Sequence, residues 1–579
     1  MNKSDKYRMS DGKVQNKQKK LKELEQNLIK LAKIAWNKTL REYYFPPLEE
    51  PHFVFDYTRK EGFYIDPEHQ WQITMNLANI PLFTEQIEYV NYFHALCLHE
   101  VSHYQIIPYD GLINAKLLKA AMKHVSSNLA PIVVNFFADL IIDGKLYKKY
   151  PKLIYWELEQ THNYVQNNYG NRISEFSKLL FRTYELLLNI KLSKDGTNST
   201  MDKVAEQIVE ITLKNFEDES VWDQKVEKIS SVLKNLIFNT FTPKSAINSK
   251  QDHEVKRKSQ VQEGSVIEIP EDVLEIMDNP LEIKNSDKIK DTSEEELRKK
   301  AEIFARETPY SEFGAPAKQA GLLVDKNPLA TWYRGLAKDL IEIKIYEEKY
   351  GGKVPIYPEP WRIGDPIDQL DITQTILTSP IIIPNFTTQK WSKKEGLGFL
   401  SEKQIPDLLL VIDSSGSMNW NYSARNPRGQ YHTALIASFA ALHYAASKGI
   451  KFSVINFSNR PDICDWTKNY HDAEKILLKY QGGGTHLPIN SIKNQCERSE
   501  RKVLVLIITD FAIYNWAAAK RILIELADKE HKIVGFFIGS SKVSQDRFKT
   551  LLNKVSFYPI KNEKVLINLV IEEVKKFYQ

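Results

Sequence analysis

The sequence predicts a multidomain α/β protein, with an α+β N-terminal domain, a helical extension and a C-terminal doubly wound parallel sheet. Its 579 residues exceed what one hydrophobic core supports, since cores stop growing at roughly 250 to 300 residues. After residue 405, short apolar runs such as DLLLVID and KVLVLIITD alternate with amphipathic stretches, which is typical of parallel strands covered on both faces by helices. In the first 150 residues, strand-like runs precede helical ones, which indicates an α+β arrangement.

The composition changes along the chain and sets the expected domain boundaries. The first twenty residues are polar and are expected to form a disordered tail. The stretch from 243 to 300 has almost nothing to bury and is expected to be a charged flexible linker. The expected organisation is a tail (1–20), an α+β domain (21–150), a helical extension (151–242), the linker (243–300), a connecting region (301–404) and the parallel-sheet domain (405–579).

The bulk composition excludes several classes of protein. The net charge of +5 is small for this length, so no nucleic-acid partner is expected, although the basic run KVQNKQKKLK leaves nucleic-acid binding as a minor alternative. Three cysteines without a C-x-x-C pair argue against a disulfide scaffold. The apolar runs are far shorter than the ~18 residues that span a bilayer, so we expect no membrane partner and a cytoplasmic location.

The stretch LCLHEVSHYQ contains the pattern H-E-x-x-H within a helical segment. His99 and His103 are four residues apart and share one face of the helix, where both imidazoles can bind one cation. Glu100 lies beside that face, where its carboxylate can act as the general base on a bound water. The spacing therefore predicts a Zn²⁺ site with Glu100 as the catalytic residue.

The helical run NFFADLIID supplies candidates for a third ligand. Asn135, Asp139 and Asp143 follow one another at four-residue spacing and form one polar stripe on an otherwise apolar helix. Buried carboxylates are costly unless a cation or hydrogen-bond donors accompany them. We expect Asp139 to be the third zinc ligand, with Asp143 as the alternative. Asp143 and Asn135 are expected to hold His99 or His103 in the right tautomer.

A strand pair, an H-E-x-x-H helix and an N-x-x-A-D-x-x-I-D helix together resemble the zincin metallopeptidases. The resemblance is closer to the metallopeptidase-like domain found ahead of von Willebrand factor A-like domains in prokaryotic proteins. It implies a zincin-like fold over 21–150 and peptidase activity that depends on zinc. The third ligand of thermolysin-like zincins is a glutamate, whereas the matching residue here is the shorter Asp139. A metal-binding domain without catalysis, and packed histidines beside surface aspartates, are the alternative interpretations.

A second set of oxygen-bearing residues follows the apolar strands of the C-terminal domain. Asp413, Ser415 and Ser417 come directly after one strand. A glycine-rich turn carries Thr485, and another strand ends at Asp510. Because the carboxyl ends of parallel strands meet at one edge of a sheet, these loops are expected to converge. Oxygen ligands of this kind suit Mg²⁺ better than zinc.

These five residues resemble the metal-ion-dependent adhesion site of von Willebrand factor A (VWA) domains, over roughly 405–579. The resemblance implies a VWA fold, a bound Mg²⁺ and a protein client or partner that offers an acidic side chain to the ion. The sequence departs from the family at Phe511, where a glycine commonly follows the aspartate, and we expect this to alter the loop more than the metal. Ordinary turn-forming residues are the alternative interpretation.

Proteins with a C-terminal VWA domain commonly work with MoxR-type AAA+ ATPases, so the resemblance also implies such a partner. The chain has no G-x-x-x-x-G-K-[ST] motif, so ATP hydrolysis would come from another subunit. The predicted function is a zinc-dependent metallopeptidase whose VWA domain recruits a client or partner. The alternative is a non-catalytic adaptor whose zinc domain is structural or degenerate.

Overall fold

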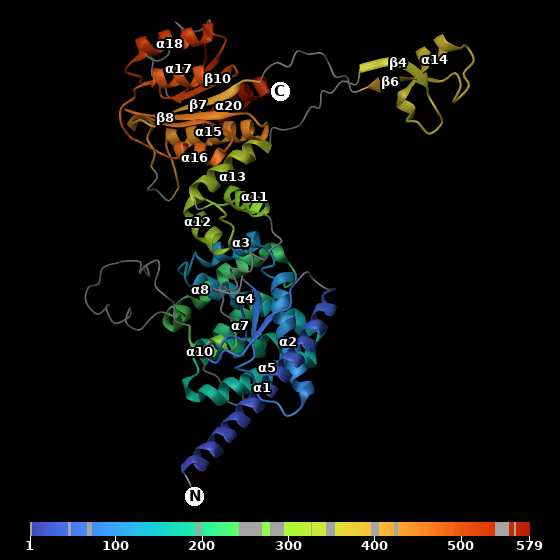
Figure 1. Ribbon diagram of the computed structural model, residues 1–579, viewed down its shortest axis with the longest axis vertical. Helices are drawn as coiled ribbons and strands as arrows, with labels where there is room; N and C mark the ends of the chain where they lie inside the picture. The colour runs from blue at the N-terminus through green and yellow to red at the C-terminus, as the bar shows by residue number, and fades with distance from the viewer. Residues whose placement is uncertain are drawn as a thin grey trace. The chain divides into compact units, whose positions relative to one another are not determined.

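The computed structural model divides the chain into two compact units, Met1–Leu336 and Ala337–Gln579 (Figure 1). The described residues are 3–44, 48–66, 72–192, 199–241, 269–277, 294–325, 327–342, 354–394, 405–421, 426–538, 555–560 and 563–578. Both units mix helices with strands, so the expected α/β composition of the chain is confirmed.

The first unit is mostly helical. Its helices are α1 (Lys3–Glu42), α2 (Gln86–Gln105), α3 (Gly111–Ala121), α4 (Ala130–Lys149), α5 (Pro151–Tyr169), α6 (Glu175–Leu188), α7 (Ser199–Leu213), α8 (Trp222–Phe241), α10 (Glu271–Leu274), α11 (Glu294–Arg306), α12 (Tyr310–Gln319) and α13 (Pro328–Glu342), the last of which runs on into the second unit. Three short strands form one small sheet in the order β1-β3-β2: β1 (His52–Val54), β3 (Gln72–Asn76) and β2 (Phe63–Asp66). The strand β3 is parallel to β1 and antiparallel to β2.

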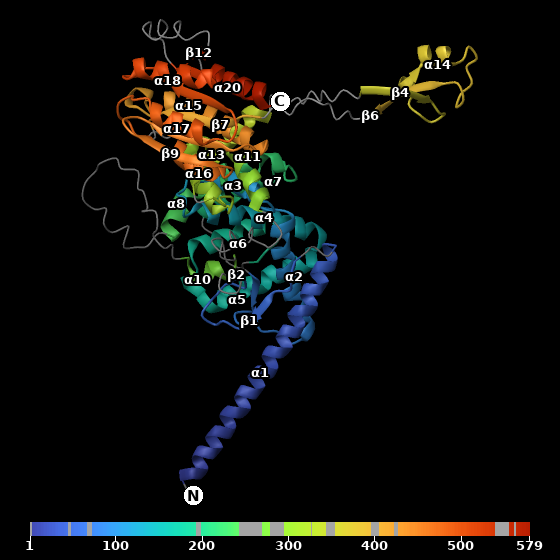
Figure 2. The same ribbon diagram turned by 45° about the horizontal axis from the view of Figure 1, so that its top comes forward.

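Helix α1 packs along α2 with its C-terminal half (Figure 2). Its buried residues include Ala32, Ala35 and Trp36, which join one apolar cluster with Phe93 and Cys97 of α2. The helix is assigned from Lys3, so it starts within the range in which we expected a disordered tail. Its contacts with α2 fix one side of the helix that carries the H-E-x-x-H pattern.

Helices α2 and α4 form the centre of the first unit. The start of α2 has a capping box, in which the Glu85 N–H donates to the Glu88 carboxylate at 3.0 Å. Helix α4 starts with Pro131 in its first turn and ends with Lys148 and Lys149, which suit the two ends of the helix dipole. Almost every residue from Ala130 to Gly144 is buried, so the polar stripe of α4 lies inside the protein.

Part of the expected linker is packed into the first unit. Residues 269–277 are described, and α10 contacts α6. Helices α11 and α12, which we expected at the end of the linker and in a separate connecting region, contact α3. Residues 294–336 therefore belong to the first of the two compact units. The rest of the expected linker lies outside the described residues.

The second unit contains the expected parallel sheet. Its strands are β7 (Asp407–Asp413), β8 (Phe452–Phe457), β9 (Pro461–Thr467), β10 (Val503–Thr509), β11 (Lys532–Ile538) and β12 (Ser556–Ile560), in the spatial order β12-β11-β10-β7-β8-β9. Five strands are parallel and the edge strand β9 is antiparallel to β8. Numbered within the sheet, this order is 3-2-1-4-5-6 read from β9, which is that of doubly wound α/β folds.

Helices cover both faces of this sheet (Figure 1). They are α15 (Gln430–Ser447), α16 (Tyr470–Leu477), α17 (Ile489–Arg498), α18 (Trp516–Asp528) and α20 (Glu563–Tyr578). Helices α17 and α18 share a core with Leu409 and Val411 of β7 on one face. Helices α15 and α20 contact each other on the opposite face. This double cover explains why β7, β8 and β10 are buried along their whole length and mostly apolar.

A second, smaller sheet comes before β7. It consists of β4 (Val354–Pro360), β6 (Gln389–Lys394) and β5 (Leu370–Asp371) in the order β4-β6-β5, with α14 (Ile372–Thr378) against β6. Among the described side chains of 354–394, Trp361 is the single buried apolar one. The sequence analysis expected only a connecting region here.

Two further expectations concern the whole chain. Within the described ranges, none of the helices combines the length and apolar character that crossing a bilayer requires. All three cysteines are buried and free, so none of them forms a disulfide.

Candidate functional site

Helices α2 and α4 bring His99, His103 and Asp139 together in the first unit. The Asp139 Oδ1 atom lies 3.5 Å from His99 Nε2 and 3.4 Å from His103 Nε2. One ligand atom from each of the three residues lies within 4.8 Å of the others. Zinc bonds of 2.0 to 2.1 Å in a tetrahedron separate the ligand atoms by about 3.3 Å. The donor atoms and their spacing therefore fit a Zn²⁺ ion.

The hydrogen-bond state of Asp139 also fits a cation. Its side chain is 2% exposed, and its Oδ1 atom is buried without a hydrogen-bond partner. The other oxygen accepts only a long hydrogen bond from Asn135 Nδ2, at 3.5 Å. A buried carboxylate oxygen without a donor is costly, and a cation bound between the two imidazoles would satisfy it.

The charges around His99 favour a positive charge at this position. Burial by itself lowers the pKa of His99, but the adjacent carboxylates of Asp143 and Asp139 outweigh it and hold this pKa well above the usual value. Burial raises the pKa of Asp139, but the adjacent imidazoles of His103 and His99 leave it below its usual value. The cluster therefore attracts a cation, whether that cation is a proton or a metal ion.

Each imidazole is oriented through its other nitrogen. His99 Nδ1 lies 2.8 Å from Asp143 Oδ1, and His103 Nδ1 lies 3.1 Å from the Ile107 carbonyl oxygen. If each Nδ1 carries the proton of this hydrogen bond, both Nε2 atoms are left as acceptors for a cation. The structure places Asp143 on His99 as expected, whereas Asn135 contacts Asp139 and neither histidine. The sequence analysis missed Ile107, because a backbone carbonyl leaves no residue-type signal.

Glu100 lies beside a small cavity next to this cluster. Glu100 is 6% exposed and lines, with His99 and Asp143, a cavity of about 80 Å³. The lining also includes Glu157 and Tyr184, which no sequence motif singled out. Burial raises the pKa of Glu157 to about 7, although Thr161 donates a hydrogen bond to it at 2.7 Å. The cavity lining therefore contains a general base candidate and a second acidic group.

The second predicted site lies at the carboxyl end of the parallel sheet. The Ser415 N–H donates to Asp413 Oδ1 at 2.9 Å, and the hydroxyls of Ser415 and Ser417 lie 3.1 Å apart. Asp413 is fully buried, and burial raises its pKa to about 6. Thr509, which the sequence analysis missed, donates to Asp413 Oδ2 at 2.6 Å.

The loops that carry Thr485 and Asp510 meet the Asp413 loop. The Gly416 N–H donates to the Gly483 carbonyl at 2.7 Å, and the Tyr514 N–H donates to the Thr485 carbonyl at 3.0 Å. A Cβ atom at Gly416 would lie 3.0 Å from the Gly482 carbonyl oxygen, so the two loops approach closely. The expected convergence of the three loops is therefore present, and their oxygen atoms are of the kind that holds Mg²⁺.

Phe511, the residue that departs from the VWA pattern, has a left-handed backbone with φ of +66°. Glycine adopts this conformation freely, whereas a bulky side chain does so at a cost. The side chain is 2% exposed, and its ring contacts Trp516, Phe537 and Phe557. The loop thus keeps the conformation that glycine favours, and core packing holds the phenylalanine in it.

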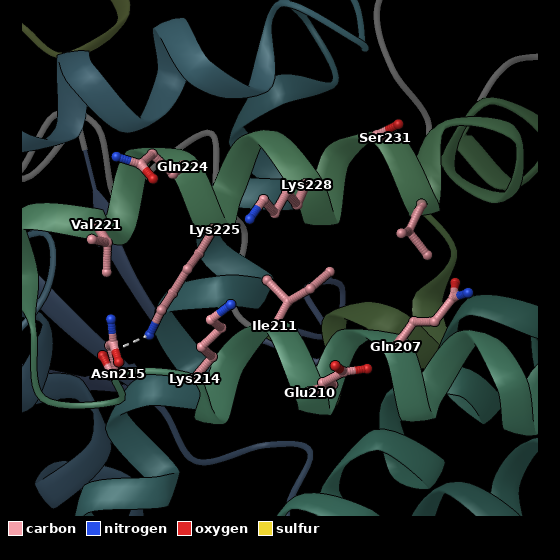
Figure 3. A pocket seen from close by; sticks show the side chains of 11 residues that line it. Gln207, Glu210, Ile211, Lys214, Asn215, Val221, Gln224, Lys225, Lys228 and Ser231 are labelled. Atoms are coloured by element: carbon pink, nitrogen blue, oxygen red, sulfur yellow. Dashed lines mark hydrogen bonds between the residues drawn. The ribbon is translucent and has the colours of Figure 1, made fainter.

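A third hollow lies apart from both clusters, between α7 and α8. It has a volume of about 560 Å³, and Lys214 and Lys228 point into it from the two facing helices (Figure 3). Lys225 is almost fully buried, and its Nζ donates to the carbonyls of Thr212 and Asn215, each at 3.0 Å. Lys225 therefore donates hydrogen bonds to backbone carbonyls at the end of α7, where helical carbonyls lack partners within the helix.

No protein-family model matches the chain, and no curated protein matches its sequence. Among solved structures, the chain is similar to the pilus adhesin SpaC from Lactobacillus rhamnosus GG, with 10% identity, 31% of each chain covered and a TM-score of 0.26. It is also similar to the SpRpn10 VWA domain, with 14% identity, 29% of this chain and 95% of that chain covered, and a TM-score of 0.24. The chain thus spans about a third of the length of the adhesin.

Proposed function

We propose that the first unit is a zinc-dependent peptidase of the zincin type. The observation that carries this proposal is the buried Asp139 Oδ1 atom, which has no hydrogen-bond partner and lies 3.5 and 3.4 Å from two imidazole Nε2 atoms. A zinc ion bound there would polarise a substrate carbonyl and lower the pKa of a bound water. The three residues would hold the ion while leaving a fourth position open.

The chain's own groups have distinct roles in this proposal. Glu100 follows His99 on α2 and lines the same cavity, so its carboxylate can accept a proton from water and return it to the leaving amine. Asp143 and the Ile107 carbonyl hold the two imidazoles in position. Burial of the cluster keeps competing water away from the reacting groups.

We further propose that the parallel-sheet domain is a Mg²⁺-binding VWA domain. Asp413, Ser415, Ser417, Thr485 and Asp510 would surround the ion, directly or through water, and an acidic side chain of a client or partner would complete its shell. The strand order and the hydrogen bonds between the three loops support this assignment. A MoxR-type AAA+ ATPase is the partner that we propose from the resemblance to proteins with a C-terminal VWA domain, and ATP hydrolysis would then take place on that partner.

One observation favours a second candidate, a non-catalytic scaffold in which zinc only stabilises the first unit. The cavity beside Glu100 measures about 80 Å³, well below the roughly 300 to 1,000 Å³ of ordinary ligand pockets. A structural zinc needs no such space, whereas a peptide substrate does.

The substitution Glu100→Gln separates the two candidates. Metal analysis should find one zinc per chain in the wild type and in Glu100→Gln, and none in His99→Ala or Asp139→Ala. The peptidase proposal expects Glu100→Gln to cut hydrolysis of a peptide library at least 100-fold, since a general base contributes about 10²- to 10⁴-fold. Glu210→Gln, at an exposed position of α7, is the matched control. Hydrolysis at the wild-type rate in Glu100→Gln would refute the peptidase and leave the scaffold.

The VWA proposal has its own test. Partner recovery in a pull-down should require Mg²⁺ and should be lost in Asp413→Ala. Asp465→Ala is the control, since its side chain is 75% exposed. Recovery that does not change between Mg²⁺ and a chelator would refute the adhesion site, and recovery of partners without an AAA+ ATPase would refute the MoxR assignment alone.

A further inference from the structure

The cavity beside the metal cluster is closed by a segment that comes from far along the chain. Leu274, Glu275, Ile276 and Met277 line it together with His99 and Glu100. These four residues belong to the short stretch 269–277, which lies between two stretches outside the described residues. A part of the chain that sequence composition marks as a linker is thus packed against the candidate active site.

Two hydrogen-bond donors and one lysine contact the acidic side chains of this segment. The Ser174 N–H donates to Asp272 Oδ2 at 2.7 Å, and Tyr169 Oη donates to Glu275 Oε1 at 2.9 Å. The Lys60 ammonium lies 3.7 Å from Glu275 Oε1 and 3.8 Å from Glu271. Lys60 lies near the small sheet, whereas Tyr169 ends α5 and Ser174 precedes α6, and together they form a receptor for carboxylates.

Apolar contacts complete the docking of the segment. Val273 and Met277 are each 3% exposed. Ile276 packs against a cluster made by Val165, Ile173 and Phe181. The segment therefore presents both acidic and apolar side chains to a surface that offers donors and an apolar patch.

With the segment in place, a peptide has no room beside Glu100. The cavity that remains has a volume of about 80 Å³, far below the roughly 300 to 1,000 Å³ of ordinary ligand pockets. The segment must leave before a substrate can reach His99 and Glu100. The groups that it vacates would then be available to the incoming chain.

We propose that residues 270–277, PEDVLEIM, are a built-in pseudosubstrate that fills a groove for acidic peptides and blocks the candidate active site until it is displaced. The preferred ligand is a short peptide that forms a helical turn, as α10 does, and that combines acidic residues with Val, Ile, Leu or Met. The binding part of this inference stands on the contacts above, and its catalytic consequence rests on the proposed peptidase function.

The test uses the full chain and a fluorescent synthetic peptide of sequence PEDVLEIM, with binding measured by fluorescence anisotropy. Val273→Asp places a charge at a buried position of the segment that does not line the cavity, so it should release the segment and leave the groove intact. We expect Val273→Asp to bind the peptide at least tenfold more tightly than the wild type. Val273→Ile, which keeps the position apolar, is the matched control and should behave as the wild type.

Two comparisons test the chemistry of the groove. In the Val273→Asp chain, a neutral peptide PQNVLQIM and the further substitution Lys60→Met should each weaken binding at least fivefold. Equal binding by wild type and Val273→Asp, or equal binding of the acidic and neutral peptides, would overturn the proposal. If Val273→Asp lost its cooperative melting transition, Asp272→Ala, which only removes the contact with the Ser174 N–H, would be judged by the same criteria.

Hydrolysis is read separately, so the two proposals can fail independently. If the Val273→Asp chain binds the acidic peptide but cleaves no peptide, the groove for acidic peptides is supported and the peptidase function is refuted. If Val273→Asp and wild type cleave a peptide library at equal rates, the segment does not block the site. The pseudosubstrate proposal is then refuted, whereas the peptidase proposal is supported.

Discussion

The Nδ1 atom of His99 lies 2.8 Å from the Oδ1 atom of Asp143, and this contact joins α2 to α4 across 44 residues of sequence. It turns the opposite nitrogen of the same ring toward Asp139, which lies one helical turn before Asp143. One helix thus supplies both the carboxylate that would bind the ion and the carboxylate that orients a histidine.

Asp143→Ala should weaken zinc binding 10- to 100-fold without removing any of the three donor atoms. The reason is that His99 loses the partner that fixes its ring and its tautomer. Competition with a chromophoric chelator measures the affinity, and Asp223→Ala at an exposed position of α8 is the control. Unchanged affinity in Asp143→Ala would mean that packing alone orients the ring.

Removal of zinc should lower the stability of the first unit. An ion that binds only the folded state contributes about 2.7 kcal/mol at 100 times its dissociation constant. Thermal unfolding with and without a chelator should therefore show a lower melting temperature for the metal-free wild type. Asp139→Ala should melt at the same temperature in both conditions, and a zinc-dependent shift in that variant would place the ion elsewhere.

The stability of the first unit should fall as the pH drops from about 6.5 to about 4, in part because of His94. This side chain is 1% exposed, and neither of its ring nitrogens has a hydrogen-bond partner. Burial lowers the pKa of His94 to about 4, and Lys38 lowers it as well. Below pH 6.5 the unfolded chain therefore binds a proton that the folded chain rejects, at a cost of about 1 to 3 kcal/mol by pH 4.

His94→Leu tests this pH dependence. The variant should show a flatter fall in unfolding free energy between pH 6.5 and 4 than the wild type, measured by urea denaturation. His124→Leu, at a half-buried position after α3, is the control. Parallel pH profiles for wild type and His94→Leu would contradict the prediction.

Substitutions at Phe511 should separate core packing from backbone strain. Deleting a buried phenylalanine ring costs about 3 to 5 kcal/mol, whereas a left-handed backbone costs a residue with a Cβ about 1 to 2 kcal/mol. We therefore expect the wild type to be the most stable, Phe511→Gly to be less stable and Phe511→Ala to be the least stable. Chemical denaturation measures the order, and an alanine variant more stable than the glycine variant would show that the backbone is relaxed at this position.

The sequence predicted helices and strands well where one or both faces of the element are buried. The strands β7, β8 and β10 are buried at every position and mostly apolar because helices cover both sides of the sheet, and this pattern can be recognised in the sequence alone. The antiparallel edge strand β9 alternates in burial and gave no comparable signal. The packing of 269–277 was not predictable, because it depends on a few contacts with residues about a hundred positions away.

The candidate metal cluster was predictable for a similar reason. The four-residue spacing of His99 and His103, and of Asp139 and Asp143, reports which side chains share a helical face. Groups that contact these residues from other parts of the fold stand at no regular spacing from them in the sequence. The Ile107 carbonyl, the Glu157 carboxyl and the Thr509 hydroxyl were therefore missed, although each lies on a predicted ligand or on the cavity beside it.

Both edge strands of the large sheet contain a proline, Pro461 in β9 and Pro559 in β12. A proline has no N–H to donate, and the neighbouring Asp462 adds a charge along the β9 edge. Another strand therefore finds a poor template at either end of the sheet. The edges of the sheet thus limit strand pairing between copies of this chain.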